Sequence, residues 1–379
     1  MDLIKSFFKS DSRCYKCGHN FALTATRRVC KICSSFYIEN LFCKNCSISL
    51  HHKYLGLLKS KRFCNDCFKV TPTSKRSNSY DTLPKQKDFS KALKSKLKIK
   101  NQDPSKDFRM IREIGSGAVG SVYLAQKGNL EEFYALKVIH LSPNFEKTRA
   151  MNEIGLMQLS THDNVIKCYS AYHNNENITL VLELMDNSIR YLVQSGVKVQ
   201  EPSIAYICKE VLKGIDWMHQ HGRMHRDIKS ENILYNMDGE IKITDFGFSA
   251  QLTKEYDVRM TIVGTPSYMA PEIILGDGYG QKVDVWAVGI LAFELAEGSP
   301  PVQGKNKLQV LAEISNSPSP RLKNLDNWSS EFKEFLAKCF EKKPEDRAEA
   351  PYLLNDPFLM KADRNEFHFL VQNLHGETK

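Results

Sequence analysis

The sequence contains no apolar run long enough to cross a membrane. Its most apolar stretch runs from Val285 to Phe293 and is bounded by Asp284 and Glu294, whereas a membrane-spanning helix needs about 20 apolar residues. The apolar start ends at Phe8 and is followed by charged residues, unlike the longer apolar core of a secretion signal. We therefore expect a soluble or peripheral cytoplasmic protein, with a buried helix around Val285.

The chain also lacks an internal repeat, which excludes a repeat architecture. It contains no recognisable small-GTPase-binding segment. Apolar residues make up 42% of its 379 residues and charged residues 26%, which is typical of a globular protein with a sizeable core. At this length we expect two or three domains. Nothing in the sequence indicates its oligomeric state.

Positive charge is unevenly distributed. Residues 1–107 contain 23 Lys and Arg against 8 Asp and Glu, a net of +15, and the rest of the chain contains 30 against 36, a net of −6. The N-terminal excess predicts an anionic partner such as a phosphoinositide or another anionic membrane surface. A solvated basic linker is the alternative, and no motif indicates a nucleic-acid partner.

The 11 cysteines are concentrated near the N-terminus, where eight form four CxxC pairs. Thiols paired in this way favour zinc sites in a reducing compartment over a disulfide framework. Two Zn²⁺ ions would supply folding energy to residues 11–70, which have few large apolar side chains. The predicted zinc ligands are Cys14, Cys17, Cys30, Cys33, Cys43, Cys46, Cys64 and Cys67.

This zinc-binding module resembles a divergent FYVE domain, because Arg27-Arg28-Val29-Cys30 leads into the second CxxC pair and Phe42-Cys43 and Phe63-Cys64 open the third and fourth. The resemblance implies crosswise pairing of the CxxC pairs and binding of phosphatidylinositol 3-phosphate at endosomal membranes. The implied lipid contacts are Arg27, Arg28, Lys31 and Arg62. The family's His-His before the second pair and its upstream Trp-x-x-Asp are absent. A RING-like ubiquitin-ligase module is the alternative, although the sequence has no Cys-x-His-x-x-Cys centre.

Residues 71–106 are expected to be a basic linker. It begins with the polar, turn-rich string from Thr71 to Ser79, which predicts disorder. From Asp88 to Lys100, apolar residues four apart predict a basic helix. Such a helix would lie on an anionic membrane, dock on the following domain, or serve only as a solvated tether.

A dense set of polar residues lies between Met224 and Gly247. It comprises His225-Arg226-Asp227-Ile228-Lys229-Ser230-Glu231-Asn232, a β-like segment at 240–244, and Asp245-Phe246-Gly247. Two carboxylates and an amide oxygen at this spacing suit metal-assisted phosphoryl transfer. The pair HRDxxxxN and DFG resembles the catalytic core of eukaryotic protein kinases.

The kinase resemblance covers residues 108–360 and implies an α+β, bilobal fold with a β-rich N-lobe at 108–185 and a helical C-lobe at 186–360. It implies that Asp227 orients the acceptor hydroxyl, that Lys229 neutralises the transferring phosphoryl group, and that Asn232 and Asp245 hold Mg²⁺ or Mn²⁺. Lys229 at this position is typical of serine/threonine kinases. Residues 361–379 are expected to be a short polar tail.

A glycine-rich segment predicts a strand, a turn and a second strand that approach phosphate groups. Glycines at 115, 117 and 120 carry no Cβ, so the backbone can come close to a ligand. Downstream, Lys137 lies in a β-branched strand and needs an anionic partner, for which the resemblance implies Glu153 on a helix predicted at 144–159. The candidate ATP-binding residues are Ile114, Gly115, Ser116, Gly117, Ala118, Val119, Gly120, Val122, Ala135, Lys137, Glu153, Glu183 and Met185.

The segment from Phe246 to Glu272 resembles a kinase activation segment, since it closes on VGTPSYMAPE. The resemblance implies that Thr265 contacts Asp227 and Lys229. It makes Thr261 the candidate activating phosphosite, pairing with Arg226, with an unmodified loop hydroxyl as the alternative. Asp284 is implied to anchor the catalytic loop.

These motifs resemble the PAK and germinal-centre-kinase branch and predict an ATP- and magnesium-dependent protein serine/threonine kinase. Its substrates would be protein Ser and Thr hydroxyls, and the zinc-binding module would place it on phosphoinositide-containing membranes. The alternatives are a pseudokinase or scaffold, and a kinase fused to a ubiquitin-ligase module. A pseudokinase is disfavoured because the residues that carry the chemistry are all present.

Overall fold

The computed structural model describes residues 47–50, 61–64, 98–117, 120–129, 131–141, 154–174, 177–252, 258–276, 278–304 and 306–376, the first two segments by their backbone alone. The chain divides into two compact units. The smaller unit comprises Met1–Ser77, Arg259–Ile262 and Pro271–Tyr279. The larger unit comprises Asn78–Val258, Val263–Ala270 and Gly280–Lys379.

The smaller unit contains two short strands, β1 (Ser47–Leu50) and β2 (Lys61–Cys64), which pair antiparallel with Ser47 opposite Cys64. It also contains the helix α7 (Pro271–Leu275) and an antiparallel bridge between Arg259 and Tyr279. The predicted zinc ligands and lipid contacts lie outside the described residues, apart from the backbone of Cys64 and Arg62 in β2. Zinc and lipid binding therefore stay predictions.

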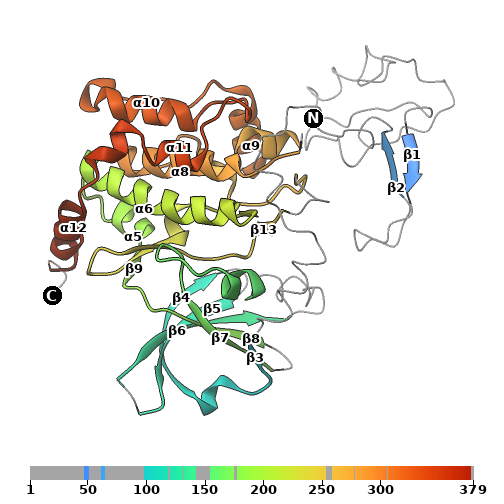
Figure 1. The fold of residues 1–379 in the computed structure, drawn as a ribbon, viewed down its shortest axis with the longest axis vertical. Coiled ribbons are helices and arrows are strands. Elements are labelled where there is room, and N and C mark those ends of the chain that lie inside the picture. Colours follow the sequence, from blue (N-terminus) through green and yellow to red (C-terminus); the bar gives the residue numbers. More distant parts are fainter. Residues whose placement is uncertain are drawn as a thin grey trace. The chain divides into compact units, whose positions relative to one another are not determined.

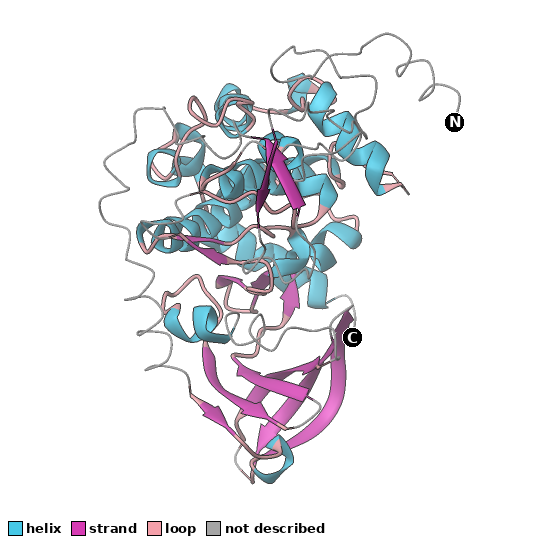
Figure 2. Ribbon diagram, turned by 90° about the vertical axis from the view of Figure 1, so that its right-hand side faces the viewer, coloured by secondary structure: helices cyan, strands magenta, loops and turns pink. Residues whose placement is uncertain are grey.

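The larger unit has a β-rich lobe and a helical lobe (Figures 1 and 2). The β-rich lobe is a six-stranded sheet in the order β3-β7-β8-β6-β5-β4. Its hydrogen-bonded neighbours run antiparallel except for β3 and β7, which are parallel. The strands are β3 (Ile99–Lys100), β4 (Phe108–Gly117), β5 (Gly120–Lys127), β6 (Phe133–His140), β7 (Cys168–His173) and β8 (Asn177–Leu182).

The sheet begins inside the segment predicted as linker. Ile99 pairs with Ala171 in β7, so the helix predicted from Asp88 to Lys100 is wrong at its C-terminal end. The Lys100 ammonium lies 2.8 Å from the Asp107 carboxylate and donates to the Tyr172 hydroxyl at 3.0 Å. A 3-10 turn, η3 (Pro104–Lys106), then leads into β4. The conformation of this segment is decided by pairing with a strand that is distant in sequence. The spacing of apolar residues within the segment gives no sign of that pairing.

The helical lobe is built around α8 (Lys282–Glu297), whose residues from Val283 to Leu295 are buried. The buried helix predicted around Val285 is confirmed. Helices α6 (Glu201–Gln220) and α10 (Ser330–Cys339) pack against α8. Within the described segments, no helix combines the length and apolarity needed to cross a bilayer. The same lobe also contains α5 (Ile189–Gln194), α9 (Lys307–Asn316), α11 (Ala350–Leu353) and the 3-10 turns η6 (Leu325–Asn327) and η7 (Pro357–Lys361).

The C-terminal segment is a helix rather than a polar tail. Helix α12 (Arg364–Gly376) packs on α6 through Phe367 and Val371, which are both fully buried. The Phe367 ring contacts Tyr206 and Tyr235, with centroids 5.5 and 5.9 Å apart. The two buried side chains are one helical turn apart, which gives α12 its single apolar face.

Candidate active site

The candidate catalytic residues lie on short strands and on the turns that connect them. Strand β10 (Arg223–Met224) pairs with β13 (Ala250–Gln251), and β11 (Ile233–Tyr235) pairs with β12 (Ile241–Ile243) and β9 (Asn187–Ser188). The catalytic loop lies between β10 and β11 and contains the 3-10 turn η4 (Ser230–Asn232). The turn at Asp238-Gly239 returns the chain through β12 to Asp245. Both ends of the predicted motif are therefore brought to one place.

Asp284, in the first turn of α8, holds the backbone of the catalytic loop. Its carboxylate accepts hydrogen bonds from the His225 N–H at 2.9 Å and the Arg226 N–H at 2.7 Å, and lies 2.9 Å from the His219 ring. Burial alone would raise the pKa of Asp284, but the His219 contact and the backbone donors outweigh it and lower that pKa. The predicted anchoring of the catalytic loop is confirmed.

Asp227 is the centre of a hydrogen-bonded cluster and is buried. Its Oδ1 accepts from both the backbone N–H (3.0 Å) and the hydroxyl (2.8 Å) of Thr265. Its Oδ2 lies 2.9 Å from Lys229 Nζ, which also donates to Thr265 Oγ1 at 2.9 Å. The predicted contacts of Thr265 are present, and they leave Lys229 with a further N–H to offer.

Asp245 pairs with Lys137 of β6. Its Oδ1 lies 3.0 Å from Lys137 Nζ and accepts from the Gly247 N–H at 3.2 Å. Burial alone would raise the pKa of Asp245, but the charge and hydrogen bond of Lys137 outweigh it and hold that pKa below its usual value. The predicted partner Glu153 lies outside the described residues, so its pairing with Lys137 stays a prediction. Both Arg226 (φ 68°) and Asp245 (φ 64°) adopt the left-handed conformation.

The oxygen atoms of Asn232 and Asp245 suit a magnesium ion. Asn232 Nδ2 donates to the backbone oxygen and Oδ2 of Asp227 at 2.8 and 2.9 Å, which fixes the amide and directs its Oδ1 elsewhere. No group of three or more His, Cys, Asp or Glu placed for a metal occurs among the described residues. Magnesium does not require one, because it takes one or two protein oxygens together with substrate phosphates.

The glycine-rich segment is a hairpin, with Gly117 opposite Gly120, Ser116 opposite Ser121 and Gly115 opposite Val122. Ala118 and Val119 lie outside the described residues. A Cβ on Gly117 would meet no atom within 4 Å, which leaves room for a ligand. A Cβ on Gly120 would lie 1.8 Å from the Val138 carbonyl oxygen. Gly120 is thus explained by the close approach of β6, not only by phosphate access as the sequence predicts.

The candidate adenine site lies where β8 ends. Leu182 is paired with Ala135 in β6, and Val122 packs against the same core. The Glu183 N–H donates to the Lys167 carbonyl at 2.9 Å, and the Glu183 side chain lies 2.9 Å from Lys242 Nζ. Among the described residues, the Glu183 carbonyl and the Met185 N–H have no hydrogen-bond partner. These two groups are available to a ligand, and their contact with adenine stays a prediction. Ile114 is exposed on β4.

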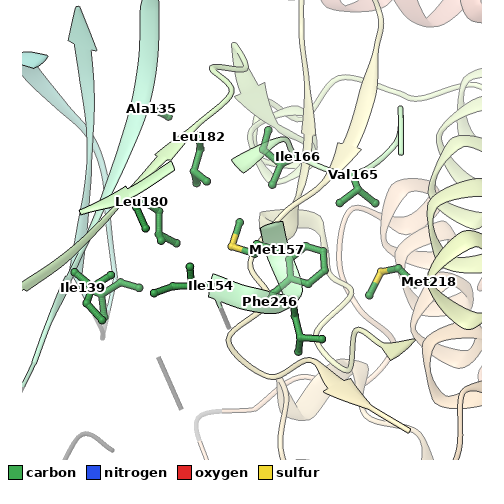
Figure 3. Close-up of a cluster of buried hydrophobic side chains, with 13 residues drawn as sticks. Ala135, Ile139, Ile154, Met157, Val165, Ile166, Leu180, Leu182, Met218 and Phe246 are labelled. Carbon is green, nitrogen blue, oxygen red and sulfur yellow. The ribbon is translucent and has the colours of Figure 1, made fainter. Parts of the chain in front are cut away.

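A buried cluster joins the sheet to the catalytic loop (Figure 3). Phe246 lies in it with Met157 and Ile154, which are on the helical segment 154–159, and with Met218 of α6. The Phe246 ring also contacts His225 edge-on at 5.3 Å, and burial lowers the pKa of His225. Ile154 and Met157 thus share this cluster with Leu180 of β8. The part played by Phe246 was not predicted from the sequence.

Within the activation segment, the structure describes residues 246–252 and 258–272. Thr261 has its carbonyl oxygen 2.6 Å from the Tyr279 hydroxyl, and its own hydroxyl lies 3.5 Å from the same atom. The 3-10 turn η5 (Pro266–Tyr268) follows Thr265. Nothing in these contacts tests whether Thr261 is phosphorylated or pairs with Arg226, so both stay predictions.

Comparison with known proteins identifies the domain. Residues 108–359 match the protein kinase domain family. The chain is 41% identical over 268 residues to the serine/threonine-protein kinase pakB of Dictyostelium discoideum, covering 70% of this chain and 31% of that protein. It is 37% identical over 319 residues to pakC of the same organism, covering 80% of this chain and 64% of that protein. It is also 37% identical over 300 residues to the serine/threonine-protein kinase STE20 of Saccharomyces cerevisiae, covering 76% of this chain and 32% of that protein.

The chain spans less than two thirds of the length of each of these relatives. The relatives are of the PAK and STE20 type, and the matched region contains the whole Asp227 cluster, Lys137 and Asp245. The chain belongs to the protein kinase family.

Proposed function

We propose that the chain is an active serine/threonine kinase that transfers the γ-phosphoryl group of ATP to protein Ser and Thr hydroxyls. The single observation that carries this is the closed set of contacts among Asp227, Lys229 and Thr265. A phosphoryl-transfer site works mainly by positioning and charge neutralisation, and this set positions a carboxylate and an ammonium together.

In the proposed mechanism, Asp227 orients the acceptor hydroxyl and accepts its proton. Thr265 holds Oδ1 of Asp227 by two hydrogen bonds, and the amide of Asn232 holds Oδ2. Lys229 lies between Asp227 and Thr265 and has an N–H left for an oxygen of the transferring group. When bound to Asn232 and Asp245, Mg²⁺ (or Mn²⁺) would neutralise phosphate charge. Lys137 would bind nucleotide phosphates while keeping Asp245 ionised.

Replacement of Asp245 tests the proposed activity. Asp245→Ala removes the only carboxylate of the proposed metal site, and we expect phosphotransfer to a protein substrate mixture to fall by at least about a hundredfold. Asp238→Ala is the matched control, because its side chain is exposed in the turn between β11 and β12. Full phosphotransfer by Asp245→Ala would refute the mechanism. A wild-type chain that neither binds ATP nor transfers phosphate would instead support the pseudokinase alternative.

We further propose that phosphorylation of Thr261 activates the kinase. A phosphate at this position adds about two negative charges and strong acceptor oxygens, and Arg226 in the catalytic loop is the proposed partner. Thr261→Ala should lower the activity of the purified protein. Prior treatment of the wild-type protein with a phosphatase should lower its activity in the same way. Equal activity of phosphatase-treated and untreated wild-type protein would contradict this.

For the N-terminal residues 11–70, we propose a FYVE-like zinc-binding module that places the kinase on endosomal membranes. The four CxxC pairs support zinc binding, and the β1–β2 pairing sets Cys64 opposite Ser47, the residue after Cys46. Metal analysis should find two Zn²⁺ per chain. Phosphatidylinositol 3-phosphate is the proposed ligand of Arg27, Arg28, Lys31 and Arg62.

Liposome flotation tests the membrane proposal. Binding should depend on phosphatidylinositol 3-phosphate and be lost in Arg28→Ala, while Arg321→Ala, an exposed arginine of the helical lobe, serves as the control. Equal binding to every anionic lipid would reduce the module to a basic patch. Discharge of ubiquitin from a charged conjugating enzyme would favour the RING-like alternative.

A further inference from the structure

Residues 98–100, which we call the strap, attach the chain that precedes the kinase domain to the edge of the six-stranded sheet. Within the strap, β3 runs parallel to β7, with Ile99 opposite Ala171. The Ala171 N–H also donates to the Lys98 carbonyl oxygen at 3.2 Å. A parallel pairing is slightly weaker per residue than an antiparallel one, and this one is only two residues long. Other contacts must therefore help to hold the strap.

The side chain of Gln158 supplies two such contacts, and both are made with the main chain of Lys98. Gln158 Oε1 accepts a hydrogen bond from the Lys98 N–H at 2.8 Å, and Gln158 Nε2 donates to the Lys98 carbonyl oxygen at 3.1 Å. Gln158 belongs to the helical segment 154–159. The strap is therefore bound to two elements at once, strand β7 and the end of this helical segment.

The strap also contacts the buried cluster that joins the sheet to the catalytic loop. Ile99 is half-buried and packs against that cluster, in which Met157 lies together with Phe246 (Figure 3). Met157 directly precedes Gln158, and Phe246 directly follows Asp245. Because buried side chains are closely packed, a shift of the helical segment would disturb Phe246 and, with it, the carboxylate of the proposed metal site.

A second set of contacts joins the end of the helical segment to the strand that precedes the catalytic loop. Arg223 of β10 is buried, and its Nη1 donates to the Leu159 carbonyl oxygen at 3.1 Å and to the Ser160 hydroxyl at 2.9 Å. Leu159 is the residue after Gln158. The end of the helical segment is thus held by the strap through Gln158 and by β10 through Leu159.

We propose that Gln158 is a positioning residue, which uses the strap to fix the helical segment 154–159 and thereby helps to place Asp245 for phosphotransfer. The strap then belongs to the functional kinase unit, although it precedes the matched family region, which begins at Phe108. The inference rests on the proposed kinase activity for its meaning in catalysis. The contacts themselves can be tested without that activity.

The test compares three variants of the full-length chain with wild type. Gln158→Leu removes both hydrogen bonds to Lys98 and nearly keeps the volume of the side chain. Ile99→Ala removes the packing of the strap and leaves its main chain unchanged. Gln303→Leu is the matched control, because Gln303 is exposed and its side chain makes one local hydrogen bond, to the Pro300 carbonyl oxygen at 3.2 Å.

Two kinds of measurement are made on each protein. Hydrogen–deuterium exchange is followed by mass spectrometry in peptides that cover residues 154–159 and 244–249. The second peptide reports on Asp245, because the Gly247 N–H donates to Asp245 Oδ1 at 3.2 Å. Steady-state kinetics with a fixed mixture of protein acceptors gives kcat and the KM for ATP, at a temperature well below the thermal unfolding of every variant.

For Gln158→Leu, we expect exchange in both peptides to be about fivefold faster or more, the scale of one neutral hydrogen bond. We expect kcat to fall by about fivefold, because a smaller fraction of the protein has Asp245 in place. The KM for ATP should change little, because Gln158 contacts neither Lys137 nor the end of β8. Ile99→Ala should act in the same direction, and Gln303→Leu should match wild type.

The double variant tests whether Gln158 and Ile99 act through the same strap. If they do, combining Gln158→Leu with Ile99→Ala should change the logarithm of the exchange rate by less than the sum of the two single changes. Simple additivity would mean that the two residues act independently, and it would overturn the proposed strap.

The proposal is also overturned if folded Gln158→Leu exchanges like wild type at residues 244–249. A lower melting temperature with unchanged kcat would likewise overturn it, because Gln158 would then contribute to stability alone. Ile99→Ala decides both points if Gln158→Leu does not fold. If wild type transfers no phosphate, the exchange measurements still decide whether the strap positions Asp245, and the missing activity counts against the proposed function only.

Discussion

The substitution Thr265→Val isolates the hydroxyl that links the two candidate catalytic side chains. Valine has nearly the same shape, so it keeps the packing and the backbone hydrogen bond to Asp227 Oδ1 at 3.0 Å. It removes the hydroxyl contacts with Asp227 at 2.8 Å and Lys229 at 2.9 Å. The change therefore tests positioning and leaves the charges unchanged.

The size of the effect follows from those two contacts. A hydrogen bond to an ionised group is worth about 1.5–3 kcal/mol, but one hydroxyl makes both contacts here and Thr265 is only half-buried. We therefore expect a loss of about 2 kcal/mol, which lowers kcat by roughly 30-fold. The KM for ATP should change little, because Thr265 contacts neither Lys137 nor the end of β8.

Steady-state kinetics with saturating ATP and a protein acceptor measures both constants. Thr265→Ser is the control, since it restores the hydroxyl without the methyl group and should recover most of kcat. The reasoning is refuted if Thr265→Val keeps kcat within about twofold of wild type, or if the serine variant is as impaired as the valine variant. Near-ultraviolet circular dichroism on all three proteins excludes a change of fold.

Three further predictions concern stability. Asp284→Asn should lower the free energy of unfolding by about 2–4 kcal/mol, because it weakens buried hydrogen bonds to the catalytic loop. The pKa of Asp284 in the folded protein lies below its ordinary 3.8, so the contribution of Asp284 to stability is present above pH 3.8 and fades as the pH falls below it. Urea titrations should therefore show the difference in stability between wild type and Asp284→Asn shrinking in acid. Gly120→Ala should lower the free energy of unfolding by about 1–3 kcal/mol, because the new Cβ would lie 1.8 Å from the Val138 carbonyl oxygen. The control is Gly117→Ala, whose Cβ would meet no atom within 4 Å, and calorimetry should find it clearly more stable than Gly120→Ala. Phe367→Ala should cost about 3–5 kcal/mol as a buried large-to-small change; a melting temperature equal to that of Phe369→Ala, an exposed phenylalanine of the same helix, would show that α12 does not belong to the folded unit.

The candidate site was largely predictable because its signals are short and local. Asp227, Lys229 and Asn232 lie within one loop, and their spacing to Asp245 is fixed by a hairpin that brings the chain back. Lys137 and Asp245 lie far apart in sequence, and the resemblance assigned both to the site but gave Glu153 as the partner of Lys137. Their 3.0 Å contact depends on how the sheet meets the loop, which local periodicity does not report.

What could not be predicted depends on tertiary pairing. Ile99 lies in a strand because it pairs with the parallel strand β7, whereas the apolar residues spaced four apart before it predicted a helix. The spacing of Phe367 and Val371 was a visible helical signal in the tail, but nothing local says which surface they cover. Glu294, at the end of the apolar stretch, requires partners for its buried carboxylate, and only the fold identifies them as Arg190 and Tyr268.

The left-handed backbone at Arg226 and Asp245 lowers the stability of the fold at two positions whose side chains the candidate site needs. Such a conformation costs roughly 1–3 kcal/mol for a residue with a side chain, and it persists here because Asp284 and Lys137 hold the neighbouring groups. Glycine would adopt both conformations freely. A laboratory selection for heat resistance alone should therefore accumulate glycine at these two positions, and it should recover stable proteins that have lost the carboxylate proposed to hold the metal ion for phosphotransfer.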